Sequence, residues 1–343
     1  MLFADSEKSS NAIIRLLNSR AAGSVRAYED AAKTVRKDAD SGETLQQFVL
    51  AVISRDADAP EAARLSAGER EKFFAASRDK IRKLAELNGN PLALYVLSME
   101  RNDMALLEQA AAGGNVQALN ALGTIRLTEA FKDATISSNA FAKAQSRAFK
   151  CFKWAADQGD YNGFYNLGMC YMSGYGCKRD EKTAFDCFKT AAEAGHPEAI
   201  NNIGGFFRDG IVVRKNPELS VLWFKKSCEL GNEFGTLNYG LALLSGQGAE
   251  KNQTGAAKLF RYLAEKRSHA EGMHLYGMCL MRGTGVDKNE KAAVGWFEKA
   301  AAKGFAMSMD NLSSCYEGGI GVEPDMQKSL VWKMRARAAA GDR

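Results

Sequence analysis

The feature that most constrains the fold of this chain is a repeat of about 36 residues marked by glycine. An apolar residue followed by a small one recurs as Leu167-Gly168, Ile203-Gly204, Tyr239-Gly240, Tyr276-Gly277 and Leu312-Ser313. The second positions of these pairs are separated by 36, 36, 37 and 36 residues. A fixed period in the range of roughly 20–50 residues indicates a repeat architecture, and the apolar residues have helical spacing. The sequence therefore predicts an all-α solenoid.

Each repeat reads as a first helix (A), a loop and a second helix (B), with its own start and stop signals. Twelve residues after the small residue of each pair comes a potential N-cap of helix B: Asp180, Asn216, Asn252, Asn289 and Asp325. Side-chain oxygens of Asp and Asn accept from the free N–H groups at a helix start. Glycines mark the A–B loops as Gly174/Gly176, Gly246/Gly248, Gly283/Gly285 and Gly319/Gly321, and Gly210 lacks a partner. The repeats close on Gly159, Gly195, Gly231, Gly304 and Gly341.

Large apolar residues recur within helix B, at the spacing of a packing stripe. They occupy two adjacent positions, the first held by Cys187, Trp223, Leu259, Trp296 and Trp332 and the second by Phe188, Phe224, Phe260 and Phe297. Side chains that recur in register pack against the same neighbours in every repeat. We therefore expect Trp223, Trp296 and Phe297 to be buried between neighbouring helices.

These residues resemble the Sel-1-like repeat family, a longer-looped relative of the tetratricopeptide repeat. The pattern is Ala-x-x-x-Leu-Gly-x-x-Tyr-x-x-Gly-x-Gly-Val, then Asp or Asn, then Ala-x-x-Trp-Phe-x-Lys-Ala-Ala-x-x-Gly. Residues 277–304 follow it almost position by position, and the resemblance extends over about residues 70–343. It implies a right-handed superhelix of antiparallel helix pairs that serves as a scaffold or adaptor.

The repeat spacing divides the chain into three parts. Residues 1–69 form a helical N-terminal cap, residues 70–160 form degenerate repeats with an insertion near 128–142, and residues 161–343 form five regular repeats. An end of a solenoid must cover its apolar face, which is the role expected of the cap. The insertion predicts a longer loop, and the last helix, which contains Arg335 and Arg337, predicts a solvated C-terminal cap.

Composition and charge limit the classes of partner. The net charge of +5 comes without a dense block of Lys and Arg, so nucleic-acid binding is not predicted. No apolar run approaches the roughly 18 residues that a membrane span needs. Residues 1–20 contain Asp5, Glu7, Lys8 and Arg15 and no apolar core of signal-peptide length. The prediction is a cytoplasmic protein, with export as the alternative if the chain is a trimmed mature form.

The sequence shows no catalytic or metal-binding constellation. Three of the seven cysteines, Cys170, Cys279 and Cys315, recur in register, as small buried packing residues do. There is no C-x-x-C, and the three histidines form no metal-ligand motif. The glycine pairs follow helices, whereas a dinucleotide cradle follows a strand. We therefore predict free thiols, no metal, no cofactor and no enzymatic activity.

One polar position recurs in helix A and is the predicted binding site. Two residues before the small residue of the pair stand Asn166, Asn202, Asn238 and Asn311. One register means one face, and a carboxamide offers both a donor and an acceptor to a peptide backbone. In related tetratricopeptide domains an asparagine at a comparable place clamps ligand backbone. The alternative is a structural role, in which each amide bonds a neighbouring helix or loop.

The resulting functional prediction is a non-catalytic scaffold that binds a protein or peptide on its concave face. Two alternatives remain. One is a regulatory or chaperone-like subunit of an enzyme or secretion system, and the other is an exported surface or virulence-type binding protein. Fold alone does not choose among them.

Overall fold

The computed structural model describes residues 12–18, 25–40, 44–54, 59–133 and 135–341, and the regular structure within them is helical. The chain forms two compact units, Met1–Phe206 and Phe207–Arg343. The boundary between them falls inside one helix, α11 (Pro197–Asp209).

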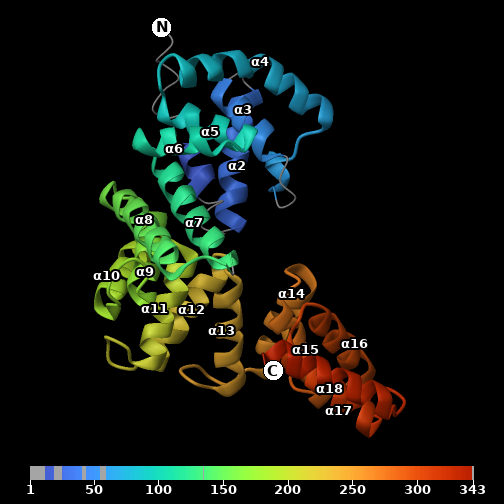
Figure 1. The fold of residues 1–343 in the computed structure, drawn as a ribbon. Helices are drawn as coiled ribbons and strands as arrows, with labels where there is room; N and C mark the ends of the chain where they lie inside the picture. The colour runs from blue at the N-terminus through green and yellow to red at the C-terminus, as the bar shows by residue number, and fades with distance from the viewer. Residues whose placement is uncertain (1–11, 19–24, 41–43, 55–58, 134, 342–343) are drawn as a thin grey trace. The chain divides into compact units, whose positions relative to one another are not determined.

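The first unit begins with helical residues 12–18 and continues through helices that pack on their sequence neighbours (Figure 1). These elements are α2 (Val25–Asp40), α3 (Thr44–Ile53), η1 (Glu61–Ala63), α4 (Ala67–Glu86), α5 (Pro91–Arg101), α6 (Met104–Ala112), α7 (Val116–Lys132), α8 (Ser138–Asp157), α9 (Tyr161–Ser173) and α10 (Glu181–Glu193). From α5 onward they form the A and B helices of successive repeats, and the B helices α6 and α8 contact the next A helices, α7 and α9 respectively.

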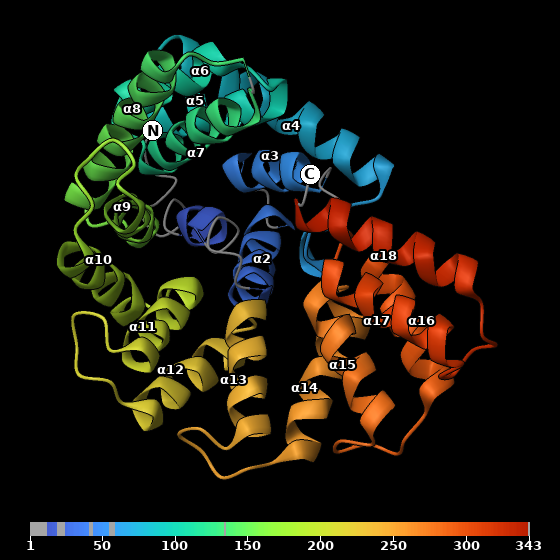
Figure 2. The same cartoon turned by 60° about the horizontal axis from the view of Figure 1, so that its bottom comes forward.

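The second unit continues the same alternation (Figure 2). Its helices are α12 (Pro217–Glu229), α13 (Glu233–Ser245), α14 (Gln253–Lys266), α15 (Ala270–Arg282), α16 (Glu290–Ala302), α17 (Ala306–Gly318) and α18 (Met326–Ala340). The pairs α13/α14, α15/α16 and α17/α18 are repeats, and α14 contacts α15 as α16 contacts α17. Both units are therefore built as an α-solenoid of helix pairs, as the sequence predicts.

The predicted helix signals act as expected. Each of the five N-cap side chains accepts a hydrogen bond from a backbone N–H of its B helix, for example Asn289 Oδ1 from Ala292 N at 2.9 Å. The closing glycines take positive φ, and Ser268 takes that place in the irregular repeat with φ 51°. Val212 replaces the second loop glycine of its repeat with φ 64°, a strained conformation for a β-branched residue.

The recurring small residue of helix A is a contact site for the phenylalanine of helix B. Phe188, Phe260 and Phe297 are at most 1% exposed. A Cβ on the facing glycines Gly168, Gly240 and Gly277 would lie 2.8, 2.6 and 2.7 Å from a ring carbon of the corresponding phenylalanine. Since real Cβ atoms do not approach that closely, glycine is what allows helices A and B to close around the ring.

The tryptophans differ from the prediction. Trp223 and Trp296 are half-buried, whereas Phe297 is fully buried. The ammonium of Lys226 lies 5.5 Å from the Trp223 ring centroid, and that of Lys299 lies 3.9 Å from the Trp296 centroid. The indoles therefore sit at the edge of the core, where one face packs on apolar neighbours and the other is covered by a cation. Phenylalanine fills the core position instead.

The surplus residues of the long repeat lie mainly in helices. Helix α7 has 17 residues and α8 has 20, whereas α9 and α10 have 13 each. The connection between α7 and α8 spans only residues 133–137. The expected longer loop is therefore wrong, because the additional sequence continues the helical hydrogen bonding from both sides.

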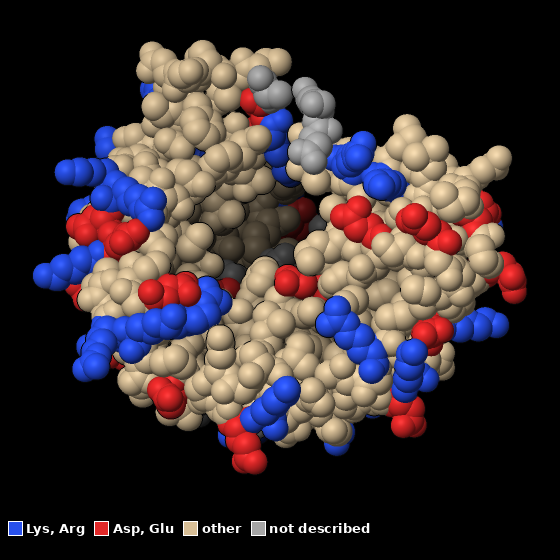
Figure 3. All heavy atoms as spheres, turned by 90° about the horizontal axis from the view of Figure 1, so that it is seen from below, with Lys and Arg blue, Asp and Glu red and all other residues tan. Residues whose placement is uncertain are grey.

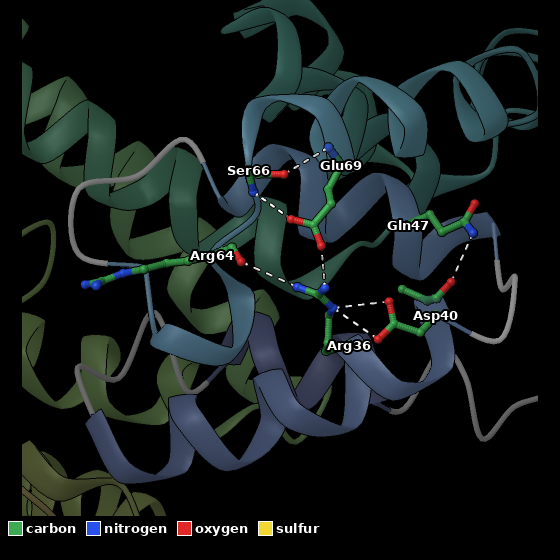
Figure 4. Close-up of polar contacts among 7 residues, drawn as sticks. Arg36, Asp40, Gln47, Arg64, Ser66 and Glu69 are labelled. Carbon is green, nitrogen blue, oxygen red and sulfur yellow. Dashed lines mark hydrogen bonds and ion pairs between the residues drawn. The ribbon is translucent and has the colours of Figure 1, made fainter.

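A polar cluster joins α2 to the start of α4 in the N-terminal part (Figure 4). Arg36 Nη2 donates to Glu69 Oε1 at 2.8 Å, and Arg36 Nε donates to Asp40 Oδ2 at 3.1 Å. Glu69 and Ser66 form a capping box, in which each side chain accepts from the backbone N–H of the other. One arginine thus links a helix end to a helix start across 33 residues of sequence.

Charged side chains of both signs are interspersed on the face in view in Figure 3. No helix in the described part of the chain is long and apolar enough to cross a bilayer.

Five cysteines are buried and two, Cys177 and Cys228, are half-buried, and none is paired. Burial raises the pKa of Cys170 to about 12 and that of Cys187 to about 11. Because the thiolate is the reactive form, we expect slow labelling of the native protein by a thiol reagent, fastest at Cys177 and Cys228.

Labelling in denaturant should find all seven thiols, and elemental analysis should find no stoichiometric zinc. A non-reduced mass lower by two hydrogen atoms per bond would show disulfides and contradict this prediction.

Candidate functional site

The four predicted asparagines occupy equivalent places, and each bonds the preceding A helix. All four side chains are half-buried. The bonds are Asn166 Nδ2 to Asn120 Oδ1 (3.2 Å), Asn202 Nδ2 to Met169 Sδ (3.8 Å), Arg208 Nη1 to Asn238 Oδ1 (3.5 Å) and Asn311 Nδ2 to Met278 Sδ (3.1 Å). The asparagines thus link successive A helices within each unit, Asn166 and Asn202 in the first and Asn238 and Asn311 in the second.

Asn166 lines a cavity that lies inside the first unit. The cavity has a volume of about 370 Å³ and is bounded by residues 12–18, α5, α7, α9 and the start of α11. Its lining residues are Leu17, Asn18, Tyr95, Gln117, Asn120, Ala121, Thr124, Ile125, Asn162, Tyr165, Asn166 and His196. We call it the carboxamide cavity, because five of these side chains are Asn or Gln.

One wall of the carboxamide cavity is a hydrogen-bonded chain that ends on a buried acid. Asn166 donates to Asn120, and Asn120 Nδ2 donates in turn to Asp160 Oδ2 at 2.9 Å. Asp160 is the N-cap of α9, and its Oδ1 accepts from Asn162 N at 3.3 Å. Burial raises the pKa of Asp160, opposed by the N–H groups that donate to it. The chain fixes which way the Asn120 and Asn166 amides point.

Asn18 also lines the carboxamide cavity and accepts hydrogen bonds from two other lining residues. Gln117 Nε2 donates to Asn18 Oδ1 at 2.9 Å, and Asn162 Nδ2 donates to the backbone carbonyl of Asn18 at 3.5 Å. The residue Asn162 is only 4% exposed. Its carbonyl oxygen, Oδ1, is buried and has no hydrogen-bond partner within the described residues. A buried polar group without a partner destabilises a fold by about 1–3 kcal/mol, and in native structures it calls for an explanation.

Aromatic rings form the third side. The His196 ring stacks on Tyr165 with centroids 4.3 Å apart and an angle of 19° between the planes. His196 Nδ1 lies 3.2 Å from Glu198 Oε2 and accepts from Ala199 N at 3.4 Å, and these contacts orient the ring. Burial, with a smaller effect from the Glu198 charge, raises the pKa of Tyr165 to about 12. Tyr165 therefore stays neutral and offers a flat surface.

The chemistry of the carboxamide cavity is that of recognition. The described residues that line it include no Lys or Arg, so an anionic ligand would find no counter-charge there. Carboxamides and a neutral stacked ring suit uncharged polar groups such as peptide units. Within the described ranges, no group of three or more His, Cys, Asp and Glu side chains is placed to hold a metal ion.

The sequence prediction used a single recurring position of helix A, and it therefore missed most of the residues that line the carboxamide cavity. Gln117, Asn162 and Glu198 share a second position, six residues before Gly123, Gly168 and Gly204. That recurrence of polar residues is visible in the sequence and could have indicated Gln117 and Asn162. The role of Asn18 could not be predicted from the sequence, because this residue lies 99 positions before Gln117 and outside the repeats.

A family model described as Sel1 repeat matches six segments, residues 142–160, 165–196, 197–232, 235–268, 270–305 and 306–332. No curated protein matches the sequence. The crystal structure of a Sel1 repeat protein from Oxalobacter formigenes is similar, with a TM-score of 0.57 and 24% identity, over 75% of this chain and 95% of that chain.

A second crystal structure is that of a protective antigen present in uropathogenic Escherichia coli strains, which displays an SLR fold. It has a TM-score of 0.58 and 23% identity, over 91% of this chain and 64% of that chain. At these identities the likeness concerns the fold alone. The six matched segments, however, cover more than half of the 343 residues. The chain therefore belongs to the Sel1 repeat family.

Proposed function

We propose that this protein is a non-catalytic scaffold that binds an extended peptide segment of a partner protein along its A helices. Sel1 repeat proteins are in general protein-interaction scaffolds. The observation that carries the finer proposal is the carboxamide cavity, with the buried and unpartnered Oδ1 of Asn162 in its wall. A rotation of the Asn162 side chain toward the cavity would let a main-chain N–H of a bound peptide satisfy that oxygen.

The contacts of Asn18 support a peptide as the ligand. Within the chain itself, Asn162 Nδ2 donates to a main-chain carbonyl and Gln117 donates to a side-chain amide. Both acceptors are amide carbonyl oxygens, the acceptor group of every peptide unit, so these side chains already bind amide groups of their own chain. The carboxamides of Asn166, Asn202, Asn238 and Asn311, which recur at one position of the A helices, would extend the same recognition along each unit.

The proposal is the same for a cytoplasmic scaffold, for a regulatory or chaperone-like subunit and for an exported binding protein. The likeness to an Escherichia coli protective antigen keeps the exported alternative open. In all three cases the A-helix face binds the partner, and the compartment decides which partner it meets.

The substitution Asn162→Leu tests the role of the cavity. Leucine has a similar shape and removes the unpartnered carbonyl together with one long hydrogen bond, from Nδ2 to the Asn18 carbonyl at 3.5 Å. The gain and the loss offset each other, so we expect a nearly unchanged melting temperature. Peptides selected from a displayed library on the full-length protein should bind the variant at least tenfold more weakly, measured by fluorescence anisotropy. The matched control is Asn139→Leu, the same change at an exposed position of α8.

Two outcomes would contradict this role. Unchanged peptide affinity in Asn162→Leu would remove the cavity from the binding site. A large drop in melting temperature would show that Asn162 is structural despite its unpartnered oxygen.

The double variant Asn202→Ala/Asn238→Ala tests the repeated asparagines. Both side chains are half-buried, and their hydrogen bonds to the preceding A helix are long, at 3.8 Å for Asn202 and 3.5 Å for Asn238. We therefore expect weaker binding of the selected peptides with a nearly unchanged melting temperature. Early melting together with normal binding would show that these amides hold neighbouring helices and are not the site.

A further inference from the structure

The buried carboxylate of Asp160 fixes which way the amides on one wall of the carboxamide cavity point. An ionised carboxylate only accepts hydrogen bonds, so Asn120 must turn its NH₂ group toward Asp160 Oδ2, 2.9 Å away. The carbonyl of Asn120 then faces Asn166, whose Nδ2 donates to it at 3.2 Å. The polar atom of Asn166 that lies outside this chain is therefore its carbonyl oxygen.

Asn162, one turn before Asn166 on α9, has the same polarity. Its Nδ2 donates to the backbone carbonyl of Asn18, which can only accept, and its atom without a partner is the carbonyl oxygen Oδ1. Residues at this spacing lie on one face of a helix, and both side chains line the cavity. Helix α9 thus supplies two carboxamides whose remaining polar atoms are acceptors, so this wall favours a ligand group that donates.

The charges around the carboxamide cavity favour a cation. The described residues that line it include no Lys or Arg. Two acids contact lining residues: Asp160 accepts from Asn120, and Glu198 lies 3.2 Å from His196 Nδ1. His196 is the lining residue that can itself become cationic, and Glu198 faces it. A positively charged group would therefore meet acids and no permanent cation here.

We propose that the carboxamide cavity takes the guanidinium group of an arginine in the bound peptide. This inference rests on the peptide-binding function proposed above and names a residue that the peptide must contain. A guanidinium has five N–H donors and no acceptor, and its plane can lie against a ring such as that of Tyr165. It would donate to Asn166, while a main-chain N–H of the same peptide donates to Asn162.

The test uses the full-length protein and the peptides selected on it from the displayed library. In the tightest peptide each arginine is replaced in turn by citrulline, which has the same length and shape but is neutral and has a carbonyl in place of one NH₂ group. We expect one arginine at which citrulline lowers the affinity about tenfold or more in fluorescence anisotropy, because a charge-assisted hydrogen bond is lost. Lysine at that position should also bind more weakly than arginine, since it lacks the planar fork of donors.

The substitution Asp160→Asn tests whether this acid positions the chain. Asparagine is as good an N-cap as aspartate, so its Oδ1 should still accept from Asn162 N and folding should be normal. Its NH₂ group would then face Asn120, which must turn over, and Asn166 would present NH₂ to the cavity. The affinity ratio between the arginine and citrulline peptides should therefore fall about tenfold or more. The control Asp186→Asn, the same change of charge at an exposed position of α10, should leave the ratio unchanged.

Three results would overturn the inference. The first is a selected peptide without arginine, or one that binds equally well with citrulline; the peptide-binding function would still stand if Asn162→Leu weakened that peptide. The second is weaker binding of both peptides to Asp160→Asn at an unchanged ratio, because Asp160 would then be structural. The third is failure to select any peptide, which would contradict the proposed function and this inference with it.

Discussion

Replacing Phe297 with alanine is expected to lower the stability of the second unit by about 3–5 kcal/mol, as truncation of large core residues does. Its ring is 1% exposed and packs against Gly277, with a ring of His274 5.7 Å away. Because helix A closes directly on this ring, the resulting cavity has little means of collapse. Chemical denaturation followed by circular dichroism measures the loss.

Trp296 provides the matched control at the neighbouring position. Its indole is half-buried and covered on one side by Lys299, so Trp296→Ala should cost about 1–2 kcal/mol, less than a fully buried ring. A loss for Trp296→Ala equal to or above that for Phe297→Ala would show that the tryptophan is the principal core residue.

The second large effect is expected for Gly285→Ala. This glycine has φ 71°, and a Cβ there would fall on the backbone carbonyl of Gln253 in the preceding B helix. A left-handed conformation costs an L-residue about 1–2 kcal/mol, and overpacking against backbone adds about 1–3 kcal/mol. We expect a total loss of about 2–5 kcal/mol in chemical denaturation.

Gly283→Ala separates the two contributions. Gly283 has nearly the same φ, 70°, but a Cβ there would meet only Lys288 Cβ at 3.3 Å. It should therefore show the conformational cost alone, about 1–2 kcal/mol. Equal losses in the two variants would mean that the loop moves away from α14 without cost, and that the second glycine is not a packing contact.

Much of the fold follows from local signals. The N-cap residues, such as Asn289, and the closing glycines, such as Gly304 with φ 85°, act on their own backbone within a few residues. Their effect does not depend on distant parts of the chain. The period then repeats these signals, so that helix pairs and their order could be predicted before any contact was known.

The predictions that failed concern how far a side chain is buried and where surplus chain goes. Tryptophan and phenylalanine are adjacent and both apolar, so periodicity does not show which of Trp296 and Phe297 fills the core. The choice depends on the depth of the slot opposite Gly277. The sequence pattern also does not show whether the surplus residues of the long repeat form a loop or longer helices. In the structure they extend α7 and α8.

For the candidate site, the sequence by itself determined that asparagines recur on one face of the A helices, because a fixed register implies a shared face. Only the tertiary structure decided what those amides contact. Asn166 bonds Asn120 across 46 residues, and Asn18 reaches Gln117 across 99. The carboxamide cavity arises from residues 12–18 packing beside α7 and α9, and no repeat pattern encodes that contact. A hydrogen bond between residues close in the sequence can be predicted from the local residue types. A cavity forms only where helices distant in the sequence pack together, so it requires the tertiary structure.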